Sequence, residues 1–155
     1  MINENFVNSV YRFNDMSGQS VKTSVEDLRN QLKLIKEEVK EIEDGLDLLD
    51  YEEILDGCVD TLYVVEGLLQ KLYNLGFDVD RAKEITAKNN DTKFLTDADG
   101  VEITLRSYTD KGVEVTAKYN VTYDSWVILD KNNKVQKPVG YVKNNLSSCV
   151  PEEFK

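Results

Sequence analysis

Hydrophobic residues in the first 95 positions recur at the spacing of amphipathic helices. They come every three or four residues, which places them on one face of a helix. The spacing predicts helices near residues 4–13, 24–46, 50–75 and 78–88. Ser24 and Asp27 form a variant of the capping box that begins a helix, and Leu75-Gly76-Phe77 fits a glycine cap that ends one. The two long helices are predicted to pack as an antiparallel pair.

Each long helix carries one continuous apolar stripe. The stripes comprise Leu28, Leu32, Ile35, Val39, Ile42 and Leu46 in one helix, and Leu55, Cys58, Val59, Leu62, Val65, Leu69 and Leu72 in the other. A single pair of helices leaves part of such stripes in water, so we expect further helices to pack on them, from another subunit. Cys58 is predicted to be a small buried hydrophobe. Gly67 is predicted to permit close packing of helices.

After residue 94 the pattern changes to alternation of apolar and polar residues, which is typical of strands. The alternating positions are Val101, Ile103, Leu105, Val113, Val115, Val121 and Tyr123, followed by the apolar run at 126–129. Turns are marked by Asp99-Gly100, Lys111-Gly112 and residues 130–133. The chain is therefore predicted to be mainly α. Residues 1–95 are expected to form an antiparallel helical bundle core, and residues 96–155 a small antiparallel β extension with a tail.

Composition narrows the chemistry. The 155 residues carry a net charge of −10, which disfavours a general nucleic-acid binder. The chain has no histidine, which excludes His-ligated zinc and the Ser-His-Asp triad. Two cysteines without a CxxC motif favour a reducing, cytoplasmic setting. We expect no signal peptide and no membrane span, since no apolar run approaches about 18 residues.

Acidic residues border the apolar stripes of both long helices. Glu38 and Glu41 share one face of the first, and Glu53, Asp56 and Asp60 follow one line of the second. In an antiparallel pair these two lines converge near the middle. Dry, unpaired carboxylates repel one another, and a hard divalent cation removes the conflict. Oxygen-only ligands select Mg²⁺ or Mn²⁺. The pattern predicts a magnesium site for a phosphorylated substrate.

A plainer interpretation of the same acids stays open. Acidic helix faces are common on protein surfaces, and Glu37 and Glu43 fit a solvated face. Lys40 and Asp44 are spaced to pair along the helix. Glu53 lies in the first turn of its helix, where a carboxylate favours the helix dipole.

Several segments have a familiar order. They are RNQLKLIKEEVKEIEDGL, EEILDGCVDTLYVVEG, LLQKLYNLGFDVD and AKNNDTKF, within residues 20–95. Together they resemble the all-α nucleotide pyrophosphohydrolase superfamily, the MazG-like and phosphoribosyl-ATP pyrophosphohydrolase-like group. KPVGY at 137–141 is a weaker echo of phage-type members. The resemblance implies a MazG-like fold and a Mg²⁺-dependent hydrolase that converts nucleoside triphosphates to monophosphates and pyrophosphate.

The resemblance also implies metal ligands. Glu38 and Glu41 match the last two acids of the family's EExxE, and Asp60 matches the aspartate of its ExxD. The chain departs from the pattern at Gly57, where the family has glutamate. Asp56 is the expected substitute, while Glu53 to Asp56 is an alternative ExxD.

The family's N-x-x-K element is matched by Asn90 and Lys93, which are expected to bind the phosphates or sugar of the nucleotide. Glu38, Glu41 and Lys93 would be the catalytic residues, with Glu37 or Glu53 positioning the water. The implied partners are a small-molecule nucleotide and further copies of the chain, as a homodimer or homotetramer. Two alternatives remain: a non-catalytic acidic helical module that binds metal, nucleotide or protein, and a phosphoribosyl-ATP pyrophosphohydrolase.

Overall fold

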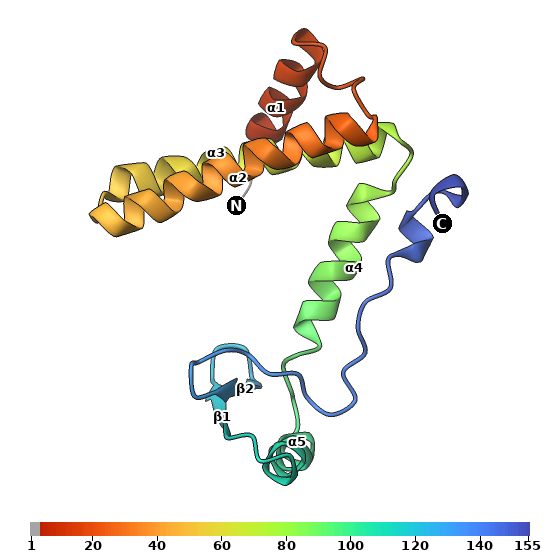
Figure 1. The fold of residues 1–155 in the computed structure, drawn as a ribbon. Coiled ribbons are helices and arrows are strands. Elements are labelled where there is room, and N and C mark those ends of the chain that lie inside the picture. Colours follow the sequence, from red (N-terminus) through yellow and green to blue (C-terminus); the bar gives the residue numbers. More distant parts are fainter. Residues whose placement is uncertain (1–3) are drawn as a thin grey trace. The chain divides into compact units, whose positions relative to one another are not determined.

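The computed structural model describes residues 4–155 and is mainly helical. In this range it contains five α-helices and one two-stranded antiparallel sheet (Figure 1). The chain forms two compact units. Unit 1 comprises Met1–Val79 and Cys149–Lys155, and unit 2 comprises Asp80–Ser148. Contacts thus divide the chain near residue 80, whereas the hydrophobic pattern changes near residue 95.

Unit 1 is built on the predicted antiparallel pair, α2 (Val25–Leu48) and α3 (Tyr51–Asn74), with α1 (Glu4–Met16) packed against α3. The capping box at the start of α2 is confirmed. The Ser24 hydroxyl accepts a hydrogen bond from the Asp27 amide, and the Asp27 carboxylate accepts one from the Ser24 amide. These bonds satisfy backbone donors that the first turn leaves without a partner.

The predicted glycine cap ends α3. Gly76 adopts a φ of 88°, a conformation that costs glycine little. The Phe77 amide donates to the Leu72 carbonyl at 3.1 Å and the Gly76 amide to the Tyr73 carbonyl at 2.9 Å, the bonding pattern of a Schellman motif. Asp50 caps the other end of α3, where its side chain accepts from the Glu52 and Glu53 amides.

The contact between α2 and α3 uses only part of the predicted stripes. The seam side of α2 is a column at steps of three and four: Leu28, Gln31, Ile35, Glu38, Ile42 and Gly45. The facing column of α3 includes Ile54, Gly57, Thr61 and Val64. The remaining stripe positions Leu32, Val39, Leu46, Leu55, Val59 and Leu62 stay 40–65% exposed. Each apolar stripe therefore consists of two neighbouring columns of residues. The partner helix covers one column, and the other stays exposed.

The prediction that Cys58 is buried is wrong, because Cys58 is exposed on α3. It follows Gly57, which faces α2, and therefore lies about 100° around the helix from the seam. Gly67 does permit close packing, as predicted. A Cβ at this position would come within 3.1 Å of the Asn14 side chain and 3.2 Å of the Gln31 side chain.

Polar groups hold α1 and the loop after it against α3. Asn14 donates to the Gln70 side chain at 2.9 Å. Lys71 is 1% exposed, and its ammonium donates to the Gln19 carbonyl at 2.5 Å and the Lys22 carbonyl at 3.1 Å. A buried charge needs such partners to replace water. The polar network fixes the loop's position in unit 1.

Unit 2 contains α5 (Ala98–Asp110) where the sequence predicted a strand. Asp97 caps this helix, and its carboxylate accepts from the Gly100 amide at 2.6 Å. The helix turns Val101 and Thr104 inward and leaves Ile103 56% exposed. The alternation of Val101, Ile103 and Leu105 favoured a strand only because Thr104 was read as polar. Thr104 is buried, and its hydroxyl accepts from the Val139 amide.

The sheet of unit 2 is a hairpin of β1 (Val115–Asn120) and β2 (Ser125–Asp130), in the register Val115↔Asp130 to Asn120↔Ser125. Strand formation at 126–129 is confirmed, as are the turns at Lys111-Gly112 and after residue 130. Val121 and Tyr123 were predicted in strands, but they lie in the hairpin loop and are about 80% exposed. Asn120 shapes this loop by accepting from two loop amides.

The helix α4 (Val79–Asp91) extends slightly beyond its predicted end. None of the helices in residues 4–155 is sufficiently long and apolar to cross a bilayer.

Candidate functional site

Glu38 lies on the seam between α2 and α3. It follows Gln31 and Ile35 along the seam column of α2 and is half-buried. A Cβ at Gly57 would come within 3.3 Å of the Glu38 carbonyl, so the backbones of the two helices approach closely at this level. The structure therefore places the Glu38 side chain beside α3, nearer the seam than its sequence position at the edge of the stripe indicated.

The negative charges of four other acids affect the pKa of Glu38. Partial burial raises the pKa of Glu38 above its ordinary value, and the negative charges of Glu41, Asp60, Glu37 and Asp56 raise it further, in that order. These acids come from both helices and are exposed. Negative charges from both helices thus act on Glu38.

Gly57 lies at a close approach of α2 and α3. A Cβ at this position would lie 2.9 Å from the Ile42 side chain, closer than real Cβ atoms come, and 3.1 Å from the Ile42 backbone nitrogen. A glutamate at 57 therefore does not fit between these helices. Asp56 and Asp60 lie on either side of Gly57 along α3, one turn apart, and remain exposed. They are the acids of α3 that influence the pKa of Glu38.

One buried hydroxyl in this seam has no hydrogen-bond partner. It belongs to Thr61, which follows Asp60 on α3. On one side of Thr61 along α3, Gly57 lies against residues 38 and 42 of α2. On the other side, the Val64 carbonyl accepts a hydrogen bond from Gln31 at 2.9 Å. A buried polar atom without a partner costs free energy. A water molecule or a ligand at the seam would satisfy it.

The acids do not form a ready-made cage. Within residues 4–155, no three acidic or cysteine side chains lie close enough together to hold a metal ion. Mg²⁺ commonly keeps several waters and binds through one or two carboxylates plus substrate phosphates. The all-oxygen donor set around Glu38 and its mutual repulsion fit that mode of binding. They do not fit a closed, all-protein site.

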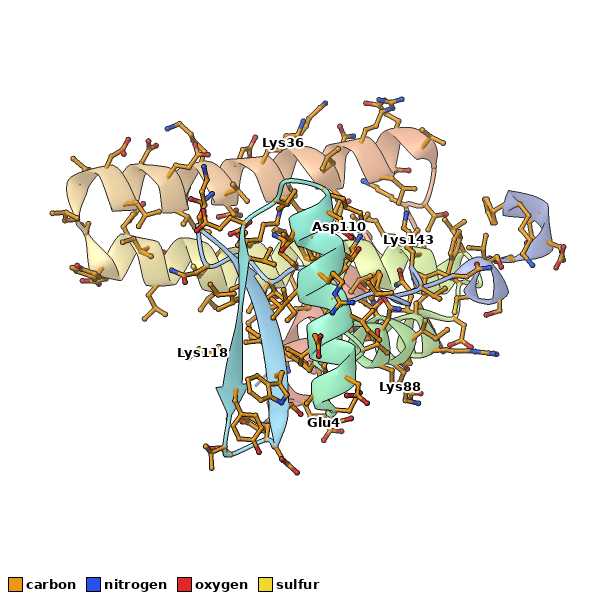
Figure 2. All side chains as sticks on the ribbon, turned by 90° about the horizontal axis from the view of Figure 1, so that it is seen from below. Glu4, Lys36, Lys88, Asp110, Lys118 and Lys143 are labelled. Carbon is orange, nitrogen blue, oxygen red and sulfur yellow. The ribbon has the colours of Figure 1, made fainter. Side chains whose placement is uncertain are left out.

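Two further acids lie beside this group. Glu37 is exposed on α2, and Glu53 is exposed in the first turn of α3. Glu53 and Asp56 line a shallow, acidic surface pocket with Asp50 and Glu52. The pairing of Lys40 with Asp44, which the plainer interpretation predicted, is present and lies on the outer side of α2. In Figure 2, Lys36 marks this helix.

The predicted phosphate-binding residues Asn90 and Lys93 belong to unit 2. The Lys93 ammonium donates to the Asn90 side chain at 2.7 Å. The neighbouring Asn89 accepts from the Tyr141 hydroxyl at 2.6 Å and donates to the Val142 carbonyl at 2.7 Å. The two motifs of the resemblance, AKNNDTKF and KPVGY, are therefore in contact. They form one polar cluster in unit 2.

Sequence reasoning missed the polar core of unit 1. Gln31, Gln70 and Lys71 are buried, and each makes a hydrogen bond to another element. The signal for Gln31 was its position, because it extends the seam column of Ile35 and Ile42 by one more turn. Long polar side chains at such positions are usually assigned to the surface.

Comparison of the chain with protein-family models, with curated proteins and with solved structures finds no match.

Proposed function

We propose that the protein is a Mg²⁺-dependent nucleoside triphosphate pyrophosphohydrolase that cleaves NTPs or dNTPs to monophosphate and pyrophosphate. One observation carries the proposal: a half-buried glutamate, Glu38, lies between two helices in the field of four further carboxylates. No lysine or arginine occurs between residues 41 and 70, the stretch that includes Asp56 and Asp60, while Lys36 and Lys40 lie beside Glu37 and Glu41 on α2. Such an arrangement is costly unless a cation is bound, which is typical of a functional site.

The residues of the seam suit distinct tasks. Glu38, Glu41, Asp56 and Asp60 would hold the cation, which when bound supplies an activated water and neutralises phosphate charge. Glu37 and Glu53 border this group and are the bases available to orient a water and accept its proton. In unit 2, the Asn90 amide and the Lys93 ammonium offer donors of the kind that bind phosphate or sugar oxygens.

Assembly is part of the proposal. The uncovered column on α2 and α3 exposes Leu32, Val39, Leu46, Leu55, Val59 and Leu62. Exposed apolar patches of this kind mark protein interfaces. A second copy that packs its own helix pair on this column would bury both, which gives the homodimer or homotetramer that the resemblance implies. The substrate pool would be cytoplasmic.

The test is an assay over all common NTPs and dNTPs, with Mg²⁺ and then Mn²⁺, that separates pyrophosphate from orthophosphate release. We expect pyrophosphate and a monophosphate, and no turnover in a metal-chelating buffer. Asp60→Asn should abolish this release and leave the helical circular dichroism unchanged. Release of orthophosphate alone, or metal-independent turnover, would refute the proposal.

A second function is favoured by a specific observation. Because Gly57 replaces the expected glutamate and no three acids lie close together in the described residues, the chain has fewer preassembled ligands than the resemblance implies. A module that binds metal or nucleotide without turnover would have this property. Saturable Mg²⁺ binding that Glu38→Gln removes, with no hydrolysis of any substrate in the panel, would support this function.

A further inference from the structure

A groove in unit 1 opens beside the acids of the seam. It has a volume of about 550 Å³ and lies between the end of α1, the loop that follows, and the first half of α2. The lining residues that matter are Phe13, Lys22, Asn30, Gln31, Leu34 and Glu37. Glu37 is next to Glu38 in the chain, and Leu34 lies one turn before Glu38 on α2. The groove therefore reaches the carboxylates from the side of α1.

The groove offers hydrogen-bonding groups beside two apolar side chains, Phe13 and Leu34. Gln31 donates its Nε2 to the Val64 carbonyl, which leaves its Oε1 as an acceptor. The Asn30 Oδ1 accepts from Lys33, which leaves the Asn30 Nδ2 as a donor. Both residues line the groove, so it presents an amide donor and an amide acceptor, the kinds of group that pair with the edge of a nucleobase. Phe13 and Leu34 supply apolar and aromatic surface for its face.

The loop wall of this groove is held in place. Gln19 and Lys22 line the groove, and their carbonyls accept from the buried Lys71 ammonium. Asn74 also donates to the Ser20 carbonyl at 2.7 Å. The wall is thus anchored to α3 by hydrogen bonds at three successive points, which makes it a preorganised surface for a ligand.

Charge is distributed unevenly along α2. Lysines and arginines occur at positions 22, 29, 33, 36 and 40, and none follows until Lys71. Lys22 and Lys33 line the groove together with two carboxylates, Asp27 in the first turn of α2 and Glu37 near the acids of the seam. Gln31 and Glu38 are seven residues apart, about 10 Å along the helix. That length suits a nucleotide with its base at Gln31 and its phosphates toward Glu38.

We propose that the groove between α1 and α2 binds the nucleoside part of a nucleotide, with the amides of Asn30 and Gln31 on the base and Phe13 and Leu34 against its face. This inference rests on the proposed function for the identity of the ligand. It adds the base-recognition residues, all from unit 1, which the sequence did not indicate.

The test compares two matched variants. Leu34 and Leu48 are both on α2 and are 43% and 78% exposed, but only Leu34 lines the groove, and Leu48 lies outside the apolar column proposed for assembly. Binding of nucleosides and of 5′-monophosphates with each common base is measured by calorimetry without metal. Leu34→Trp should fill the groove and weaken binding at least tenfold, whereas Leu48→Trp should stay within twofold of the unmodified chain. Equal affinities in the two variants, or no binding to the unmodified chain at millimolar ligand, would overturn the proposal.

A third variant tests the base contact. Asn30→Leu removes the amide at an exposed position, so the fold should persist. The ratio of affinities for the best and worst base should fall about tenfold, the effect of one lost hydrogen bond. An unchanged base preference would overturn the assignment of Asn30.

These measurements distinguish failure of the proposed nucleoside-binding groove from failure of the proposed hydrolase activity. A chain that binds monophosphates in the groove but releases no pyrophosphate from any triphosphate would keep this inference and refute the enzyme. A chain that hydrolyses triphosphates with the same KM in Leu34→Trp and Leu48→Trp would keep the enzyme and refute the groove.

Discussion

Unit 1 and unit 2 of this chain differ in charge far more than in size. Unit 1 has 19 acidic and 8 basic residues, a net charge of −11, while unit 2 has 10 acidic and 11 basic residues, a net charge of +1. The whole anionic character of the protein therefore belongs to the helical unit. In unit 1 the acids gather on the part of α2 and α3 that extends beyond α1 (Figure 1). The overall net charge hides this contrast between the two units.

The units also differ in how their elements are held. In unit 1, long polar side chains such as Gln31 and Lys71 are buried in the helix contacts. In unit 2, the hairpin packs against α5, and the buried residues include Val101, Thr104 and Ile128. The single tryptophan, Trp126, is on β2 of unit 2. Its fluorescence therefore reports unit 2, while helical circular dichroism reports mainly unit 1.

The largest expected effect concerns which unit carries the chemistry. Glu38→Gln should reduce Mg²⁺-dependent pyrophosphate release by about 100-fold or more, because it removes the central carboxylate of the proposed metal site. Lys93→Met in unit 2 should reduce it about tenfold, through loss of one charged hydrogen bond. Glu43→Gln, on the exposed side of α2, is the control. Equal losses in Glu38→Gln and Glu43→Gln would place the site elsewhere.

Close packing of the seam should be the most sensitive structural feature of unit 1. Gly57→Val places a branched side chain where even a Cβ meets Ile42 at 2.9 Å, and should lower the free energy of unfolding by about 1–3 kcal/mol. The urea midpoint by circular dichroism should fall, while the midpoint by Trp126 fluorescence changes less. The adjacent exposed substitution Cys58→Val should leave both nearly unchanged. A parallel fall of both probes would show that the units unfold together.

Lys71, the buried lysine of unit 1, should affect both the stability of the protein and its dependence on pH. Lys71→Met leaves the Gln19 and Lys22 carbonyls without their donor and should cost about 1–3 kcal/mol. Burial lowers the pKa of Lys71 in the folded state, so the unfolded chain binds its proton more tightly. Stability of the unmodified protein should therefore rise as pH increases through the folded pKa towards the ordinary lysine pKa of 10.5. Lys71→Met should lack this rise in alkaline urea titrations.

A substitution in the core of unit 2 should instead affect Trp126 fluorescence more than circular dichroism. Thr104→Val removes the acceptor of the Val139 amide in the core of unit 2 and should cost about 1 kcal/mol. The loss should appear in the Trp126 fluorescence midpoint. Thr116→Val on the exposed face of β1 is the control, and it should not shift that midpoint. A Thr104→Val shift confined to circular dichroism would contradict the assignment of Thr104 to the unit 2 core.

The smallest expected effect is the pH dependence that Glu38 adds. Because its folded pKa is raised, its contribution to stability is complete below the ordinary glutamate pKa and is lost as pH rises through the folded value. Without metal, Glu38→Gln should therefore unfold at a slightly higher temperature than the unmodified chain at pH 7. At pH 4 the two midpoints should converge. Added Mg²⁺ should raise the midpoint of the unmodified chain only.

Local signals in the sequence predicted the helical elements of unit 1 well. The capping box at Ser24 and the glycine cap at Gly76 involve residues within a few positions of one another, so short-range chemistry determines them. The same approach failed over residues 98–110. There the residues that alternate in polarity also fit a helix, and the choice depends on the contact of Thr104 with Val139, 35 residues away.

The sequence by itself determined the two long helices, their antiparallel pairing, and the acids that follow them, because helical periodicity and capping are local properties. Only the tertiary structure decided which column of each stripe forms the seam. That choice depends on where Gly45 and Gly57 allow the backbones to approach, and close approach is a property of both helices together. It places Glu38 in the seam, leaves Cys58 exposed, and opens the groove beside Gln31.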